Sequence, residues 1–357
     1  MSVCGAHRGR TFFHNACRVK KYLKFLIIKR SITVTAENKF KMSAGKTVVI
    51  ALGGNAMLQA KEKGDYDTQR KNVEIAASEI YKIHKAGYKV VLTSGNGPQV
   101  GAIKLQNQAA ANVSPEMPLH VCGAMSQGFI GYMMSQAMDN VFCANNEPAN
   151  CVICVTQTLV DPKDQAFTNP TKPVGRFYTE QEAKELMAAN PGKILREDAG
   201  RGWRVVVPSP RPLEIVEYGV IKTLIDNNVL VICTNGGGIP CKRENNIISG
   251  VDAVIDKDLA TSLLAKTLKS DYLMILTDVP NACINYKKAD EKKLEEIKLS
   301  EILALEKDGH FAAGSMGPKV RAAIEFTQAT GRTSIITSLN TAVDALNGKC
   351  GTRIVKD

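Results

Sequence analysis

From residue 46 onward, short apolar runs with the pattern of buried strands alternate with longer stretches that have helical spacing. Residues 47–52 (TVVIAL) are apolar throughout, which is typical of a strand covered on both faces in a parallel sheet. Residues 69–86 then place apolar side chains at helical spacing, and residues 88–93 form a second predicted strand. Such repeated strand–helix units predict an α/β fold, an open αβα sandwich with a mainly parallel central sheet.

The alternation returns in the C-terminal half, with helices predicted at 215–227, 256–268 and 318–330 and strands at 229–234, 272–277 and 333–337. Between the halves, residues from about 161 to 212 break the rhythm with seven prolines and the only tryptophan, Trp203. We predict that this stretch is a small protruding subdomain inserted into the sandwich.

The net charge of +11 comes almost wholly from the N-terminal end. Residues 1–41 hold ten of the 46 Lys and Arg residues and a single acid, Glu37, whereas the rest is nearly balanced. Because no basic face with interleaved aromatic residues follows, we expect no nucleic-acid partner. The basic arm, residues 1–41, has the composition of an organellar transit peptide. The interpretation that we favour is translation from Met42, or a disordered arm, ahead of one folded domain at 42–357.

Membrane and metal sites are both disfavoured by the sequence. The apolar run at 25–28 is far shorter than the ~20 residues that span a bilayer, so no membrane association is expected. Cys151 and Cys154 form a CxxC, but residues three apart on a strand face opposite sides, which makes a shared metal awkward. We expect buried free thiols in a reducing compartment. A cytoplasmic location is therefore predicted, or an organellar one if the arm is a targeting peptide.

Three predicted strands end in turns rich in glycine and asparagine, at residues 53–55, 94–97 and 235–238. In open α/β sheets, ligands bind beyond the carboxyl ends of the strands. Glycine allows backbone N–H groups to approach an anion, and a helix that starts there adds its positive dipole. Any one turn is equally well explained by ordinary tight-turn chemistry, but several at one edge predict an anion site.

Familiar catalytic motifs are missing. The sequence has no GxxxxGK[ST] phosphate loop, no complete dinucleotide fingerprint, and no HExxH, GxSxG or protein-kinase motif set. Its five histidines are scattered, and the helical position of His84 favours packing over catalysis.

Three lysines stand out by their surroundings. Lys172 lies between two prolines in NPTKPVG, Lys257 lies at the predicted start of a helix in VIDKDLA, and Lys319 follows Pro318 in GSMGPKV. A lysine near a helix N-terminus opposes the helix dipole, a choice that makes sense if an anion lies between such residues. Taken singly, each is better explained as a solvated surface lysine.

Seven stretches together resemble the carbamate kinases of the amino acid kinase superfamily: VIALGGNA (49–56), TSGNGPQVG (93–101), NPTKPVGRFY (169–178), NGGGIP (235–240), DAVIDKDLA (252–260), LTDVPN (276–281) and GSMGPKV (314–320). Many superfamily members carry a lysine just before the Leu-Gly-Gly of the first strand, where this chain has Ala51. In carbamate kinases a lysine of the protruding subdomain replaces it, and Lys172 matches that position. The resemblance covers residues 47–355.

The resemblance implies phosphoryl transfer between carbamoyl phosphate and ADP, by a homodimer that binds Mg²⁺ with the nucleotide. It implies that Lys172 grips carbamoyl phosphate, that Lys257 and Lys319 neutralise the transferring phosphoryl group, and that Asp258 holds these lysines. The implied substrate cradle consists of Gly53, Gly54, Asn55, Gly95, Asn96, Gly237 and Gly238, and the implied nucleotide site of Leu276, Thr277, Asp278, Met316 and Lys319.

Protein ligands for the metal are not implied, since Mg²⁺ is carried mainly by the nucleotide phosphates. The expected direction is ATP formation at the end of arginine breakdown. The alternatives are a superfamily kinase for another small acid and a non-catalytic binding protein on the same scaffold. Ala51 and the insertion argue against the first, and the presence of all three lysines and Asp258 argues against the second.

Overall fold

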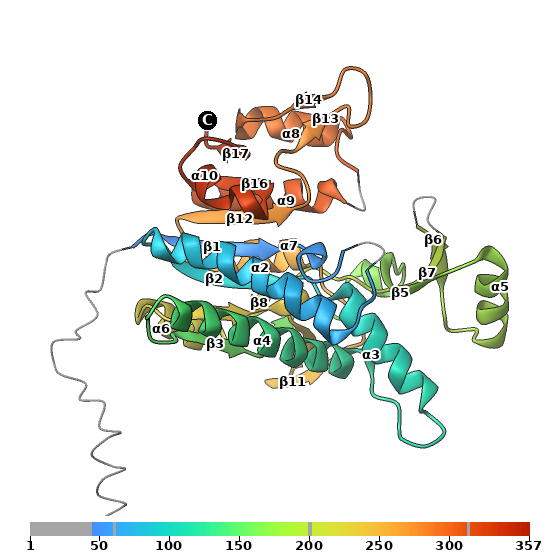
Figure 1. Cartoon of the computed structure of the whole chain (residues 1–357). Coiled ribbons are helices and arrows are strands. Elements are labelled where there is room, and N and C mark those ends of the chain that lie inside the picture. The colour runs from blue at the N-terminus through green and yellow to red at the C-terminus, as the bar shows by residue number, and fades with distance from the viewer. Residues whose placement is uncertain (1–44, 60–61, 199–201, 313–314) are drawn as a thin grey trace, which may run out of the picture. The chain divides into compact units, whose positions relative to one another are not determined.

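The computed structural model (Figure 1) describes residues 45–59, 62–198, 202–312 and 315–357. The predicted basic arm, residues 1–41, lies outside the described residues. Among the described residues, no helix combines the length and the apolar character needed to cross a membrane.

The central sheet has eight strands, and its long middle section is parallel, which confirms the predicted fold class. Only β17 runs antiparallel to its neighbour β16, near one edge. In spatial order the strands are β15 (Glu296–Lys298), β17 (Thr352–Val355), β16 (Ser334–Ser338), β12 (Tyr272–Thr277), β1 (Thr47–Leu52), β2 (Lys89–Ser94), β9 (Leu230–Cys233) and β3 (Cys151–Cys154).

Both faces of this sheet are covered by helices, as strands apolar throughout require. Along β1, Val48 and Ile50 enter one core and Val49 enters the other, because successive side chains of a strand point to opposite faces. The first core is closed by α2 (Tyr66–Lys85), α4 (Leu119–Ala144) and α10 (Ala342–Leu346). The second is closed by α6 (Tyr218–Asp226), α7 (Lys257–Leu268), α8 (Leu299–Lys307) and α9 (Met316–Thr330).

The same alternation separates the CxxC cysteines. Cys151 packs against the first core and Cys154 against the second, which confirms that the pair does not share one face of β3. The eight cysteines within the described residues are free. Burial raises the pKa of the Cys151 thiol to about 12, so it stays protonated at neutral pH.

The predicted helix at 215–227 is wrong at its beginning. Glu214–Ile215 forms strand β8, and α6 starts only at Tyr218. Strand β8 pairs with β4 (Gln157–Leu159) in a second sheet that also contains β10 (Ile239–Glu244) and β11 (Ile247–Gly250). A short antiparallel pair, β13 (Cys283–Ile284) and β14 (Lys292–Lys293), lies between β12 and β15 in the chain.

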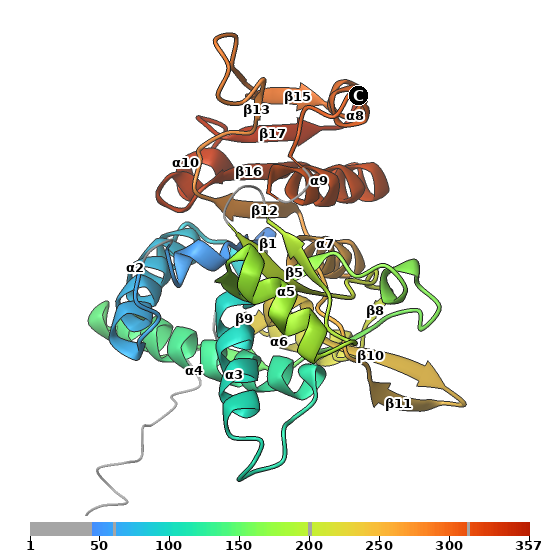
Figure 2. The same cartoon turned by 90° about the vertical axis from the view of Figure 1, so that its right-hand side faces the viewer.

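The proline-rich stretch forms a separate three-stranded antiparallel sheet and one helix, which project from the body in Figure 1 and face the viewer in Figure 2. Its elements are β5 (Lys172–Tyr178), α5 (Glu180–Ala189), β6 (Leu195–Glu197) and β7 (Trp203–Val207), preceded by the 3₁₀ turn η2 (Gln165–Phe167). A Thr179–Glu182 capping box starts α5. Strand β5 touches α3 (Gly97–Ala109) so closely that a Cβ on Gly101 would lie 2.5 Å from the Cα of Gly175.

Candidate active site

Two of the predicted glycine turns meet at the carboxyl ends of β1 and β2. Gly53 and Gly54 lead from β1 into the 3₁₀ turn η1 (Gly54–Ala56), which contains Asn55. A Cβ on Gly95, just after β2, would lie 3.2 Å from the Gly54 nitrogen and 3.3 Å from Lys257 Cδ. The turns therefore lie against each other and against the first residue of α7, as the sequence predicts for one site.

The third turn, η3 (Asn235–Gly237), packs against the second. Gly236 has a φ of +67°, and a Cβ there would overlap the side-chain amide of Asn96, so glycine is required. Asn96 Nδ2 donates to Ser126 Oγ at 2.8 Å, and Ser94 Oγ donates to Asn235 Oδ1 at 2.9 Å. These contacts fix the Asn96 amide beside the turn.

Some of the predicted cradle residues have a structural role. The N–H groups of Gly237 and Gly238 donate to carbonyls within the turn, and that of Gly95 donates to the Leu52 carbonyl. These three donors are thus occupied in the structure. Gly237 and Gly238 have φ values of +89° and +87° and lie against Ile255 and Thr158, so their glycine character is explained by backbone geometry and close packing.

Two of the predicted lysines converge on one buried carboxylate. Lys257 Nζ lies 2.6 Å from Asp258 Oδ1, and Lys319 Nζ lies 3.3 Å from Asp258 Oδ2. Only 4% of the Asp258 side chain is exposed, against 13% for Lys257 and 17% for Lys319. The helices α7 and α9 bring the lysines together from positions 62 residues apart.

The charges of this cluster support one another. Burial disfavours ionisation of Asp258, but the two ammonium groups outweigh it and hold the pKa of the carboxyl well below its usual range. Burial also lowers the pKa of Lys257, and the Asp258 carboxylate opposes that shift. A dry, charge-rich cluster of this kind is typical of sites that stabilise a developing negative charge.

Lys172 reaches the same region from the inserted subdomain. Its Nζ lies 2.7 Å from Asp256 Oδ2. The other oxygen of Asp256 caps α7 by accepting from the N–H groups of Asp258, at 2.9 Å, and Leu259, at 3.2 Å. The sequence interpretation did not single out Asp256, and the available signal was an aspartate, a favoured cap, as the first residue of the helix predicted at 256–268.

A cavity of about 630 Å³ is lined by Thr277, Asp278 and Met316 of the predicted nucleotide site. Leu276 is buried and does not line it. Its carbonyl oxygen instead faces Gly53, and it lines a neighbouring cavity of about 520 Å³. Sequence reasoning missed Tyr286, His310 and Phe311, which also line the first cavity.

Comparison with known proteins agrees with this geometry. The amino acid kinase family model matches residues 46–338. A carbamate kinase of Giardia intestinalis is 94% identical over 317 residues, which cover 88% of this chain and all of the relative. The chain belongs to the carbamate kinases of the amino acid kinase family. The predicted family, and with it an enzyme that transfers phosphoryl groups, are confirmed.

More distant carbamate kinases match over the same length. That of Trichomonas vaginalis is 49% identical, covering 86% of this chain and 99% of the relative. Among solved structures, carbamate kinase from Giardia lamblia bound to AMP-PNP has a TM-score of 0.83 and 96% identity. The same enzyme bound to citric acid has a TM-score of 0.85 and 94% identity. Each covers 88% of this chain and 99% of the solved chain.

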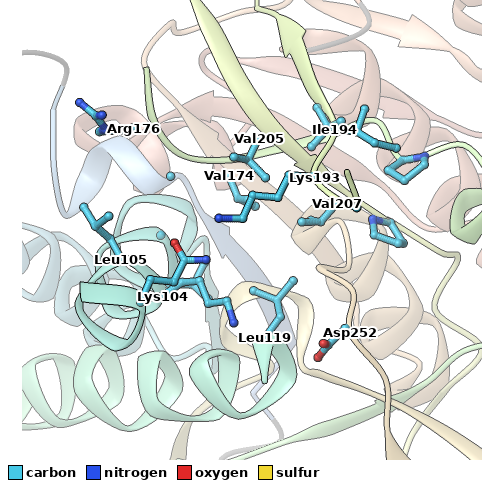
Figure 3. Close-up of a pocket in the computed structure, with 18 of the residues that line it drawn as sticks. Lys104, Leu105, Leu119, Val174, Arg176, Lys193, Ile194, Val205, Val207 and Asp252 are labelled. Carbon is cyan, nitrogen blue, oxygen red and sulfur yellow. The ribbon is translucent and has the colours of Figure 1, made fainter. Parts of the chain in front are cut away.

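A further cavity of about 470 Å³ lies between α3 and the inserted subdomain (Figure 3). Valines of β5 and β7 face Leu105 and Leu119 across it. Its charged groups are largely paired, Lys104 with Glu116 at 2.6 Å and Asp252 with His120 at 3.1 Å. None of the predicted site residues lines this cavity.

Within the part of the chain that the structure describes, protein side chains alone form no metal site. The described residues contain no group of three or more His, Cys, Asp or Glu side chains that could hold a metal ion. Asp256 and Asp258, the acids nearest the lysines, are already engaged by ammonium groups. The residues present therefore do not by themselves fit a bound Mg²⁺.

Proposed function

We propose that the chain catalyses reversible phosphoryl transfer between carbamoyl phosphate and ADP, giving ATP and carbamate. The observation that carries the proposal is the convergence of Lys257 and Lys319 on the buried carboxylate of Asp258, beside the glycine turns. In the ATP-forming direction, the bond between the phosphorus and the carbamoyl oxygen breaks, and an ADP β-phosphate oxygen forms the new bond. Carbamate leaves with the bonding electron pair.

Lys257 and Lys319 act on the transferring group in this proposal. Phosphoryl transfer depends mainly on positioning and on neutralising charge spread over the phosphoryl oxygens. Each lysine ammonium carries three donors, so contact with Asp258 leaves others for the phosphoryl group. Because Asp258 holds both ammonium groups before substrate arrives, little reorganisation is needed in the transition state.

Carbamoyl phosphate is placed by Lys172 and by the turns at 53–55 and 95–96. Lys172 keeps 32% of its side chain exposed, so it can meet an incoming phosphate. Gly237 and Gly238 belong to this site as packing residues, because they lie against Ile255 and Thr158 in the turn whose Gly236 packs against Asn96. In the reverse direction, carbamate attacks as an anion, so no general base is needed.

The nucleotide is assigned to the cavity of about 630 Å³, with Thr277, Asp278 and Met316 in its wall. Lys319, three residues after Met316 on α9, links that cavity to the lysine cluster. The solved Giardia lamblia carbamate kinase binds AMP-PNP, which supports a nucleotide site in this fold. We propose that Mg²⁺ enters with the nucleotide phosphates, because the described residues offer no metal cluster of their own.

ATP formation is the proposed direction, because carbamoyl phosphate is a high-energy mixed anhydride. An arginine-breakdown route that supplies carbamoyl phosphate stays a prediction.

We also propose a homodimer. Strand β3 is an edge strand of the main sheet, and the helix α4 beside it exposes Met125 and Tyr132. Light scattering of the purified protein tests the dimer. The cytoplasmic location stays a prediction too.

An assay of ATP formation tests the function directly. Purified protein is given carbamoyl phosphate, ADP and Mg²⁺, and ATP is measured with time. We expect saturable turnover that stops when any one of the three is withheld. A folded sample that binds ADP but forms no ATP would contradict the proposal.

A further inference from the structure

Asp256 is the contact point between the inserted subdomain and the helix that carries Lys257 and Asp258. One of its oxygens caps α7, and the other lies 2.7 Å from Lys172 Nζ. The Asp256 side chain is 15% exposed, so the pair is shielded from most of the solvent. An ion pair in such a place is stronger than one at an open surface.

The segment that carries Asp256 is itself fixed to the subdomain and to the glycine turns. The N–H of Val254 donates to the carbonyl of Pro208, at the end of β7, at 2.9 Å. Ile255 is buried, and its carbonyl lies so close to Gly237 that a Cβ on that glycine would be 2.7 Å away. Asp256 is therefore a rigid acceptor whose place is set by neighbours on both sides.

The backbone of Lys172 is also held in place. Strand β5 begins at Lys172, which pairs in register with Val207 on β7, one residue before the anchored Pro208. Strand pairing and the Asp256 ion pair thus hold both ends of the lysine side chain. Since an ammonium group has three donors, Lys172 can keep Asp256 and still donate to a phosphate.

We propose that Asp256 is a positioning residue, which holds Lys172 at the strand ends so that carbamoyl phosphate meets a lysine already in place. This inference rests on the proposed function. It assigns Asp256 no contact with the substrate. Its carboxylate would repel a phosphate, and it favours substrate binding through Lys172, whose ammonium group it contacts.

If Asp256 hinders Lys172 instead of positioning it, the expected change in substrate binding has the opposite sign. If Asp256 merely retained Lys172 and had to release it, removing its charge would strengthen carbamoyl phosphate binding. If it positions Lys172, removing its charge weakens binding. The sign of the change in KM therefore separates the two.

Asp256→Asn is the informative variant. Asparagine caps helices about as well as aspartate, so the contacts to the N–H groups of residues 258 and 259 are kept. Its side-chain NH₂ cannot accept from Lys172, so the ion pair is lost. We expect kcat/KM for carbamoyl phosphate to fall about tenfold or more, the scale of a hydrogen bond to a charged group. The KM for ADP and the melting temperature should stay near the parent values.

Two further variants give the test its controls. In a Lys172→Met background, Asp256→Asn should bring no further loss, because the residue through which it acts is gone. Asp252→Asn makes the same chemical change four residues earlier, on an aspartate whose side chain is 59% exposed, and should remain within about twofold of the parent. If Asp256→Asn does not fold, Asp256→Ser retains a capping oxygen without the charge.

The outcomes separate this inference from the proposed function. A parent protein without ATP formation would sink the function itself. A working parent with Asp256→Asn kinetics equal to those of Asp252→Asn would overturn the inference alone. So would a lower KM for carbamoyl phosphate, or an equal loss with and without Lys172.

Discussion

Lys257 Nζ lies 2.6 Å from a carboxylate oxygen of its chain neighbour, Asp258, whose side chain is only 4% exposed. Neighbouring residues at a helix start seldom meet in this way, because they point to different sides of the helix. Here the second Asp258 oxygen also receives Lys319 from α9, so one buried acid orders two lysines from two helices. The proposed chemistry depends on this arrangement.

Removing the charge of Asp258 should change the pH dependence of the reaction. Burial lowers the pKa of Lys257, and Asp258 partly restores it. In Asp258→Asn that support is lost, so the pKa of Lys257 falls further and the lysine loses its proton at lower pH. We expect the alkaline limb of the kcat/KM profile to move to lower pH, as measured by initial rates of ATP formation. An unchanged limb would show that Lys257 need not be protonated.

Lys172 should act on one substrate only. It lies on β5 in the subdomain, away from the cavity that holds Thr277 and Met316. Lys172→Ala should raise the KM for carbamoyl phosphate and leave ADP binding unchanged, with kcat falling as well if the contact tightens in the transition state. Lys184→Ala, an exposed lysine of the same subdomain, is the matched control. Equal losses for both substrates would argue against the assigned role.

Gly95 should tolerate no side chain, for steric reasons. A Cβ there would press on the Gly54 backbone and on Lys257 Cδ, at 3.2 and 3.3 Å. Gly95→Ala should therefore displace Lys257 or the first turn and lower kcat/KM by roughly tenfold or more, since a small misplacement is costly in catalysis. Gly219→Ala on α6, where a Cβ meets nothing within 4 Å, should behave like the parent. Matching rates for the two variants would place the reaction away from these turns.

The sequence predicted those parts of the molecule that local patterns determine. Buried strands are apolar throughout, and glycine turns follow them, so the sheet and the meeting of these turns at its strand ends could be predicted. The lysines at 257 and 319 were marked by their unfavourable places near helix starts, and the packing of α7 against α9 then brings them together. The family resemblance added the role of Lys172.

The rest depended on contacts between distant segments. Lys172 and Asp256 are 84 residues apart, and their meeting follows from where the subdomain returns to the body at Pro208. Tyr286 and His310 line the cavity of about 630 Å³ and lie in loops without a regular period. Strand β8 is two residues long, and its pairing with β4 overrode the helical pattern that continues into α6. Local sequence patterns do not predict such contacts between distant segments.

The most direct test of the account is the rate of ATP formation by Lys257→Ala and Lys319→Ala with both substrates saturating. Each variant lacks one of the two ammonium groups that neutralise the transferring phosphoryl group. We therefore expect kcat to fall on the order of 10²–10³, the loss expected for one preorganised electrostatic contact. Lys222→Ala, an exposed lysine on α6, should keep the parent rate. If both site variants turn over within a few-fold of the parent, the two lysines do not stabilise the transferring group and the proposed mechanism is wrong.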